Sequence, residues 1–570
     1  MPLTPRTLRR LFAVGAVLAV LVAAGFYLRG ILKGRSTLKI TPKDIPSNVA
    51  RSGTGFTYSQ SEGGKTLFTI HAASFQQYKE AGRAEGGKAE LHDVSIIVYG
   101  REDNRSDQIY GSDFLYDPDS GDVSARGEVR IDLETDASVS ASPDKPPANE
   151  TKNLIHVKTS GLTFNRKTGM AVTHEKIEFR IPGASGSATG ATYDSHASEL
   201  KLDSAVRIVT TEKQKATITA QSATVTKDPR EIVLHGTRVE QPERTVSADN
   251  VSVFLRDDST VEKVLGSGNI HATQPGPKGF DIKSGQGELL LVGQNQPRTA
   301  TLWGGVELQR GGDTPASGKA GKVVLNFTSR GGVASARAED SVDFSQGPPG
   351  RSAELIARAV DLTVKNGRIL EKAVTSAGPA QIVIAQGTGK NTISAGRFEA
   401  SFTRDNKLSS VTGSPDARIV SSTPGQPDRV ASGKELLANF NSKGEISSAE
   451  ITGDFHYQEA QRTATADHAR YTVADENYVL TGSPRVVDSG VALTADAIEL
   501  NRKSGSASGQ GNVKTTYNDL KAQPSGGMLA GAEPIHVTGD TVTASRSAAS
   551  ARYTAARLWQ GANIVEAPVL

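Results

Sequence analysis

The sequence predicts an all-β protein, an elongated antiparallel structure of stacked hairpin repeats that follows one N-terminal transmembrane helix. Three observations predict this fold class. Short segments of alternating apolar and polar residues recur through most of the 570 residues, as expected of strands with one wetted face. Glycines recur at similar intervals along these segments. A single uncharged run stands near the N-terminus, and no stretch of helical periodicity follows it.

The uncharged run, residues 11–28, is near the lower limit of length for crossing a hydrocarbon core of about 30 Å. We expect residues 1–35 to form a cytoplasmic tail and a transmembrane anchor. Cleavage as a signal peptide near Ala24 is the alternative, but apolar residues continue past that point. Because no second span follows, the rest of the chain is expected on one side. The predicted localisation is therefore the inner membrane, single-pass, with the bulk of the chain in the periplasm.

A repeat of strand, polar turn and strand dominates the remainder of the sequence. Residues 246–272, 463–487 and 491–517 show it clearly, and each second strand closes on a glycine followed by alternating apolar residues. Two strands in about 30 residues exclude a propeller blade, which needs four strands in about 40 to 45 residues. The marker glycines are Gly236, Gly268, Gly413, Gly453, Gly482 and Gly511.

Composition shifts divide the extracytoplasmic part into two predicted regions. Residues 36–140 are expected to form a first β module. A proline-containing linker follows at residues 141–153. The repeat array then occupies residues 154–570.

Charge and residue composition exclude several classes of function. The 65 Lys and Arg residues nearly balance the 62 Asp and Glu residues, so nothing indicates nucleic acid as a partner. Cysteine is absent, which excludes disulfides and a cysteine nucleophile. The ten histidines are scattered without metal-ligand spacing. We therefore predict no catalytic residues, no metal and no cofactor.

Several segments of the first module resemble LptC, the membrane-anchored periplasmic component of lipopolysaccharide export. They are Gly55-Phe-Thr-Tyr58 and residues 65–75, 89–100 and 109–131. The later repeats have the form apolar-x-Ala-x-x-Ala-x-apolar followed by Gly-x-apolar-x-apolar. These repeats resemble LptA, the partner of LptC, also called the OstA-like domain. The chain departs from both families in its much greater length.

The resemblance implies a fold and a function. The implied fold is an antiparallel β-jelly roll, the β-taco, whose apolar groove holds the acyl chains of lipopolysaccharide or a related glycolipid. The implied function is a non-enzymatic periplasmic bridge. Permease subunits of an inner-membrane ATP-binding-cassette transporter would supply the lipid, and an outer-membrane receiver with an OstA-like domain would accept it.

Candidate groove residues are the apolar residues at strand spacing in the first module. Any half-buried strand shows the same pattern, so lining a groove and forming a plain core remain equal alternatives. The candidates are Phe56, Tyr58, Phe68, Ile70, Ile96, Val98, Phe114, Tyr116, Val129 and Ile131.

The C-terminal segment is a candidate docking edge. A stack of hairpins leaves an unpaired strand at its end, and such an edge invites pairing unless Lys or Pro blocks it. Residues 555–570 contain only Pro568, Arg557 and Glu566 of this kind. The predicted edge residues are Leu558, Trp559, Ile564 and Val565. Two rival functions stay open: a structural or adhesive envelope protein without lipid cargo, and a polysaccharide-processing enzyme.

Overall fold

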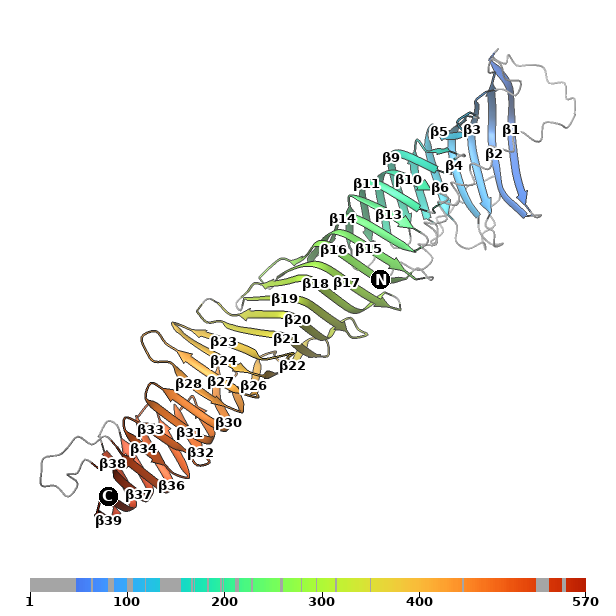
Figure 1. The fold of residues 1–570 in the computed structure, drawn as a ribbon. Helices are drawn as coiled ribbons and strands as arrows, with labels where there is room; N and C mark the ends of the chain where they lie inside the picture. Colours follow the sequence, from blue (N-terminus) through green and yellow to red (C-terminus); the bar gives the residue numbers. More distant parts are fainter. Residues whose placement is uncertain are drawn as a thin grey trace. The chain divides into compact units, whose positions relative to one another are not determined.

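The computed structural model describes residues 48–570 except for loop segments, the longest of which are 80–86, 100–105, 134–154 and 519–532. Every regular element in these residues is a β-strand, and there are 39 of them (Figure 1). The all-β prediction is therefore confirmed.

The chain divides into two compact units. Unit 1 comprises residues 1–275 and 283–300, and unit 2 comprises residues 276–282 and 301–570. The strands up to the boundary are β1 Val49–Glu62, β2 Lys65–Tyr78, β3 Ala89–Tyr99, β4 Ser106–Tyr116, β5 Asp122–Ala125, β6 Glu128–Leu133, β7 Ile155–Ser160, β8 Thr163–Asn165, β9 Met170–Ile181, β10 Ala184–Asp194, β11 Glu199–Thr210, β12 Thr217–Ala220, β13 Ser222–Thr226, β14 Glu231–Gln241, β15 Arg244–Leu255, β16 Val261–Gln274, β17 Phe280–Val292 and β18 Gln296–Arg310.

The remaining strands belong to unit 2. They are β19 Ala316–Phe327, β20 Val333–Gln346, β21 Ala353–Lys365, β22 Ile369–Ser376, β23 Ala380–Gln386, β24 Gly389–Ala395, β25 Arg397–Phe402, β26 Leu408–Ser414, β27 Ala417–Ser422, β28 Arg429–Gly433, β29 Glu435–Phe440, β30 Ile446–Glu459, β31 Arg462–Thr472, β32 Asn477–Thr481, β33 Arg485–Asp488, β34 Val491–Thr494, β35 Ala497–Asn501, β36 Ser506–Tyr517, β37 Ile535–Ser545, β38 Ser550–Gln560 and β39 Asn563–Val569.

Within each unit, antiparallel pairing follows the order of the chain. A long strand pairs either with the next long strand or with two shorter ones that share its length. In unit 2, β30 pairs with β31, which then pairs with both β32 and β33. Tight turns return the chain beside the strand just completed, and residues 489–490 join β33 to β34 with positive φ at both positions. Such turns match the twist of the flanking strands.

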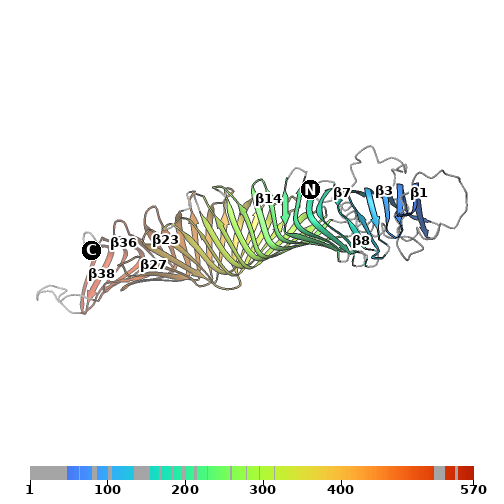
Figure 2. The same ribbon diagram turned by 90° about the horizontal axis from the view of Figure 1, so that it is seen from above.

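Many strands bend near their middle, as the green and yellow strands of Figure 2 show. Several bends consist of a glycine and a polar residue that both have positive φ, a conformation that costs little only for glycine. The backbone N–H of Asp496 on the neighbouring strand donates to Gly511 O at 2.8 Å. The bends of this kind are Gly268-Asn269, Gly453-Asp454, Gly482-Ser483 and Gly511-Asn512.

These bends explain four of the six marker glycines. Gly236 also has positive φ, but Thr237 after it does not. Gly413 is not among the residues with positive φ. A Cβ atom at Gly413 would lie 2.7 Å from the ring of Phe398, so this glycine makes room for an aromatic side chain. The marker glycines therefore have two different structural roles.

Each bend also changes the spacing of buried residues. Residues two apart share a face of a strand, yet Ala466 and Ala469, three apart across a bend, are both buried in one core cluster. Ala495 and Ile498 follow the same rule. We call the face formed by such buried residues the inner face. The x-Ala-x-x-Ala pattern is thus the sequence signature of a strand that bends while keeping one face inward.

We expect Gly511→Ala to lower the free energy of unfolding by about 1–3 kcal/mol. The new Cβ would overlap the Asp496 carboxylate, and φ is +72°. Urea denaturation measures the loss. Gly387→Ala is the matched control, because φ there is +62° but nothing lies within 4 Å of the added Cβ. Equal losses in the two variants would show that the close approach at the bend is unimportant.

The predicted fold class is wrong in its specific form. An elongated jelly roll with an N-terminal transmembrane helix was expected, but the described residues form 39 strands and contain no helix. A jelly roll contains Greek-key connections, whereas the pairing within each unit is sequential. The physical reason is the short turns, which leave no chain for a crossover.

The predicted single-pass inner-membrane localisation is also wrong. In the ranges that the structure describes, no helix has the length and apolar character needed to cross a membrane. The predicted span, residues 11–28, and the whole of residues 1–35 lie outside the described residues. An apolar run near the lower limit of spanning length, about 17 residues, was insufficient ground for the prediction.

The predicted linker at residues 141–153 also lies outside the described residues. The strands that flank it, β6 and β7, pair with each other. One core cluster contains both Val129, from before the linker, and Tyr193, from well after it. The core of unit 1 therefore continues across the predicted module boundary.

Candidate functional site

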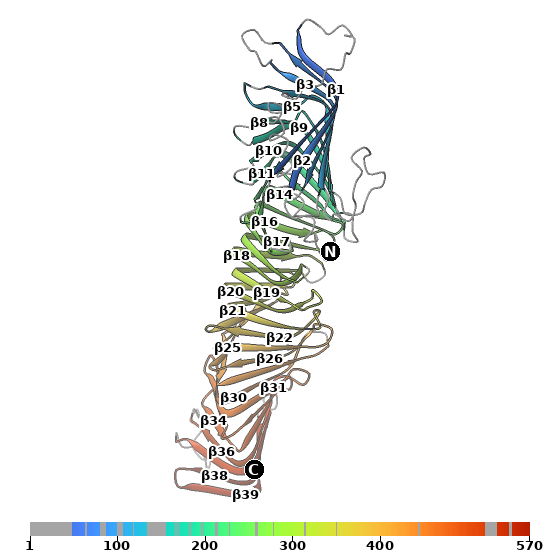
Figure 3. The same ribbon diagram turned by 90° about the vertical axis from the view of Figure 1, so that its right-hand side faces the viewer.

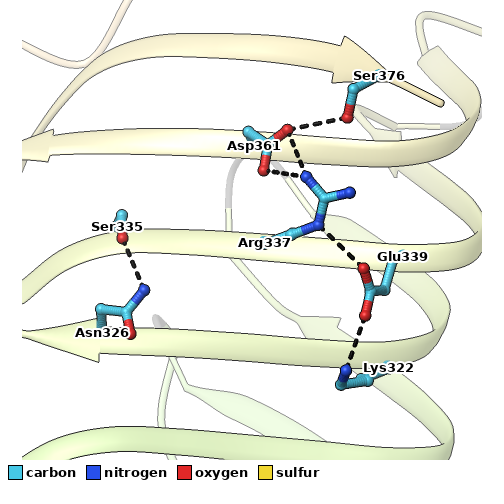
Figure 4. Close-up of polar contacts among 7 residues, drawn as sticks. All are labelled: Lys322, Asn326, Ser335, Arg337, Glu339, Asp361 and Ser376. Atoms are coloured by element: carbon cyan, nitrogen blue, oxygen red, sulfur yellow. Dashed lines mark hydrogen bonds and ion pairs between the residues drawn. The ribbon is translucent and has the colours of Figure 1, made fainter.

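The outer face of the sheet is polar. In unit 2, Arg337 on β20 donates to both carboxylate oxygens of Asp361 on β21 at 2.7 and 2.8 Å (Figure 4). Lys322 contacts Glu339 at 2.9 Å, and hydrogen bonds from Lys322 and Arg337 lower the pKa of that glutamate. These side chains are partly exposed to solvent, so the pairs contribute little to stability. These charged side chains make the outer face hydrophilic.

The inner face of unit 2 is apolar, and cross-strand register arranges it in rows. Each bend divides a strand into two halves. The halves on one side of the bends form the first arm of the sheet, and the halves on the other side form the second arm. One row runs along the first arm, one step in from its tips, and joins Tyr457, Ala464, Val486, Leu493, Thr515, Val537 and Leu558. The first arm comprises residues 429–433, 455–466, 485–494, 513–517, 535–538 and 556–565, and the second comprises residues 446–452, 469–481, 497–510 and 541–554.

A charged row lies at the tips of the first arm, one step outward from the apolar row. Arg429 is opposite Glu459, and Glu459 is opposite Arg462. The guanidinium of Arg462 donates to Asp488 at 2.6 and 3.0 Å. On each of these strands, the inner face therefore changes from apolar to charged over two residues, as from Tyr457 to Glu459. We call residues Arg429, Glu459, Arg462 and Asp488 the rim row.

Tyrosines connect the two arms across the inner face. The hydroxyls of Tyr517, on the first arm, and Tyr553, on the second, are 2.9 Å apart. Burial is the main cause that raises the pKa of Tyr517 and of Tyr457, and Glu459 also raises that of Tyr457. Tyr478, on the second arm, has a raised pKa for the same first reason. These phenols therefore stay neutral at physiological pH and act as hydrogen-bonding groups.

Two buried threonines interrupt the apolar rows. Thr515 in unit 2 is 3% exposed and Thr237 in unit 1 is 4% exposed. Among the described residues, neither side-chain hydroxyl has a hydrogen-bond partner. An unpaired buried hydroxyl costs free energy, so each marks a point on the inner face where a polar group of a ligand would be stabilising.

The predicted groove residues with described side chains lie in the core of unit 1. Phe114, Val129 and Ile131 are 4, 0 and 2% exposed and belong to one cluster, against which Phe56 packs. Tyr116 is half-buried. The side chains of the other candidates lie outside the described part, namely Tyr58, Phe68, Ile70, Ile96 and Val98. Their role in a groove stays a prediction.

The predicted docking residues lie on two strands. Ile564 and Val565 are on β39, which pairs with β38 and has no second partner strand in the described chain (Figure 3). Leu558, on β38, is buried in the core, whereas Trp559 stacks on His536. Ile564 is 54% exposed. The open strand edge is thus present, and docking at it stays a prediction.

An open hollow of about 520 Å³ lies over the outer face of unit 1, lined by β6, β7, β9, β10 and β11. Its charged side chains are largely paired with one another. Asp132 contacts His156 at 2.6 Å, and Lys176 contacts Glu178 at 2.5 Å. The hollow is therefore a solvated charged surface. Val157, Phe179 and Val209 are its apolar lining residues, and charged side chains surround them.

Sequence reasoning missed the rim row and the tyrosines between the arms. In the sequence, these residues are visible only as members of alternating strand segments on either side of the turns. The pairing of distant strands was needed to show that they lie together. Within the described ranges, no three His, Asp or Glu side chains come close enough together to hold a metal ion.

One comparison bears on this inner face. Residues 381–506 match the family described as LptA/(LptD N-terminal domain) LPS transport protein. This segment includes the rim row and both Tyr457 and Tyr478. Comparison with curated proteins gives no match.

The match supports the lipopolysaccharide transport family and a role in lipopolysaccharide transport to the outer membrane. It agrees with the resemblance of the later repeats to LptA. The first module, residues 36–140, lies outside the matched segment, so its likeness to LptC stays a prediction.

Proposed function

We propose that the chain is a non-enzymatic bridge that carries lipopolysaccharide, or a related glycolipid, on its inner face toward the outer membrane. The observation that carries this proposal is the layered inner face within the matched residues. An apolar row containing Val486 and Leu493 lies directly beneath the charged rim row. This order matches a glycolipid, in which acyl chains join a charged sugar headgroup.

The hydrophobic effect supplies the affinity for such a cargo. Each methylene group removed from water contributes about 0.8 kcal/mol, so an acyl chain between the arms would be held without specific contacts. The buried hydroxyls of Thr237 and Thr515 would then face ester or hydroxyl groups of the chains. The polar outer face, represented by Arg337 and Asp361, stays in water.

The proposed partners follow from the same reasoning. Permease subunits of an ATP-binding-cassette transporter would load the lipid. An outer-membrane receiver with an OstA-like domain would accept it at the open edge of β39. The LptC resemblance of residues 36–140 supports loading at the N-terminal end, and the match at residues 381–506 supports transport through unit 2.

Photo-crosslinking in cells tests the proposed cargo site. A diazirine-bearing phenylalanine at Phe114, on the inner face of β4, should capture lipopolysaccharide. The same residue at Tyr110 should capture far less. Tyr110 is opposite the outward Arg130. Its neighbour Gly111 faces inward with Phe114, because a Cβ at Gly111 would lie 2.7 Å from the Phe114 ring, so Tyr110 and Phe114 lie on opposite faces of β4. Gel-shifted bands probed for lipopolysaccharide give the yields.

Equal yields at Phe114 and Tyr110 would contradict a cargo site on the inner face. Absence of capture at both positions would favour an envelope protein without lipid cargo. Thermal unfolding of both variants establishes that each is folded.

A further inference from the structure

The two arginines of the rim row have different surroundings. Arg462 is held by Asp488 through two hydrogen bonds and contacts Glu459 at 3.3 Å. Arg429 is half-buried, and in the described part of the chain it has no hydrogen-bond or ion-pair partner. Its cross-strand neighbour, Glu459, is engaged by Arg462 and by the hydroxyl of Tyr457 at 3.1 Å. Arg429 is thus the cation of the rim row that remains available.

The position of Arg429 places its charge at the inner face. Arg429 shares the face of Ala431, which packs against the core of unit 2. Its charge acts on Tyr457 of the first arm and on Tyr478 of the second arm, and it partly offsets the raised pKa of both phenols. Arg429 therefore lies near the phenols of both arms. The hydroxyl of Tyr457 already donates to Glu459, so Tyr478 supplies the neutral hydroxyl donor beside Arg429.

We propose that Arg429, with the hydroxyl of Tyr478 beside it, binds a phosphate group carried by the headgroup of the glycolipid. A guanidinium presents several N–H donors in a planar fork that fits phosphate oxygens. The Tyr478 phenol adds a donor without adding charge. This inference rests on the proposed function and assigns the phosphate contact within it.

The chemistry of the surrounding rows favours a lipid phosphate. A phosphate at Arg429 would place the attached sugar at the rim and the acyl chains over the apolar row that begins at Tyr457. Half-burial of Arg429 reduces screening by water and salt. The contact should therefore discriminate between cargoes that differ only in phosphate.

The test compares two variants and two lipids with the full chain. Arg429→Gln removes the charge and leaves a shorter side chain that can still form hydrogen bonds. Arg418→Gln is the matched control, because Arg418 is exposed on the adjoining β27 and its neighbour Ile419 packs inward. The probes are purified lipid A and the same lipid A after enzymatic removal of its phosphates. Fluorescence titration gives the affinities, and thermal unfolding confirms folding.

We expect Arg429→Gln to weaken binding of phosphorylated lipid A roughly tenfold, the range for a hydrogen bond to a charged group. Binding of the dephosphorylated lipid should stay unchanged, as should both affinities of Arg418→Gln. An unchanged affinity of Arg429→Gln for the phosphorylated lipid, or an equal loss for both lipids, would overturn the inference alone. Failure of the wild-type chain to bind either lipid would overturn the proposed function as well.

Discussion

Replacing Ile498 with Asp should unfold unit 2 and abolish cargo binding there. Ile498 is 0% exposed and packs in the core cluster with Leu480. A carboxylate at this position would have no partner among the apolar side chains around it, and burying an unpaired charge is among the most destabilising of substitutions. We expect a loss of about 4 kcal/mol or more in the free energy of unfolding.

The matched control is Val479→Asp. Val479 precedes Leu480, so its side chain lies on the outer face, with Arg470 and Glu499 opposite on the two neighbouring strands. The new carboxylate would stay in water near a cation, and the loss should be about 1 kcal/mol or less. Urea denaturation followed by circular dichroism measures both. A comparable loss in the two variants would mean that the inner and outer faces of β32 and β35 are assigned incorrectly.

Removing β39 should abolish capture of the receiving partner on the docking hypothesis. Deletion of residues 561–570 leaves β38 complete, including its buried Leu558. Strand addition uses the free N–H and C=O groups of an edge strand, and β39 is an end strand of unit 2. The purified OstA-like domain of the outer-membrane receiver is the probe, and surface-immobilised capture is the measurement.

Because deletion creates a new edge, a point variant is also needed. Ile564→Lys places a charge of the kind that blocks strand addition and should weaken capture by at least about tenfold, or 1.4 kcal/mol. Val473→Lys is the control, since Val473 is likewise exposed, at 40%, but lies in a turn. Capture that survives both the deletion and Ile564→Lys would place the docking surface elsewhere.

The glycine repeat shows what a local sequence pattern can predict. The recurrence of Gly453, Gly482 and Gly511 identifies a regular structural event, because positive φ restricts residue choice wherever it occurs. The sequence did not reveal that the event is a bend within a strand. A turn between two strands and a bend within one both require positive φ, and only the pairing on either side separates them.

The transmembrane prediction failed for a different reason. A run of apolar residues reports length and hydrophobicity, and the length of residues 11–28 is near the lower limit for a span. The jelly-roll prediction failed because connection order is a property of strand pairing. Local alternation cannot specify which distant strand is the neighbour.

For the candidate site, the sequence predicted which residue types alternate but not which ones meet. Val129 and Ile131 were assigned to one face by their spacing, and burial confirms that they share it. A face that holds a ligand and a face that only packs in a core give the same sequence pattern. Separating the two requires knowing which residues of several strands lie side by side, and the strand register gives that information.

The sequence by itself determined that this protein is all-β, that one face of its strands is apolar, and that glycines mark a repeated backbone event. These properties depend on φ preferences and on the two-residue period of a strand, which are local. Only the tertiary structure decided that Tyr517 meets Tyr553 and that Arg429 has no ion-pair partner among the described residues. Those contacts depend on register between strands and on the approach of two arms, so they arise from pairings across the sheet.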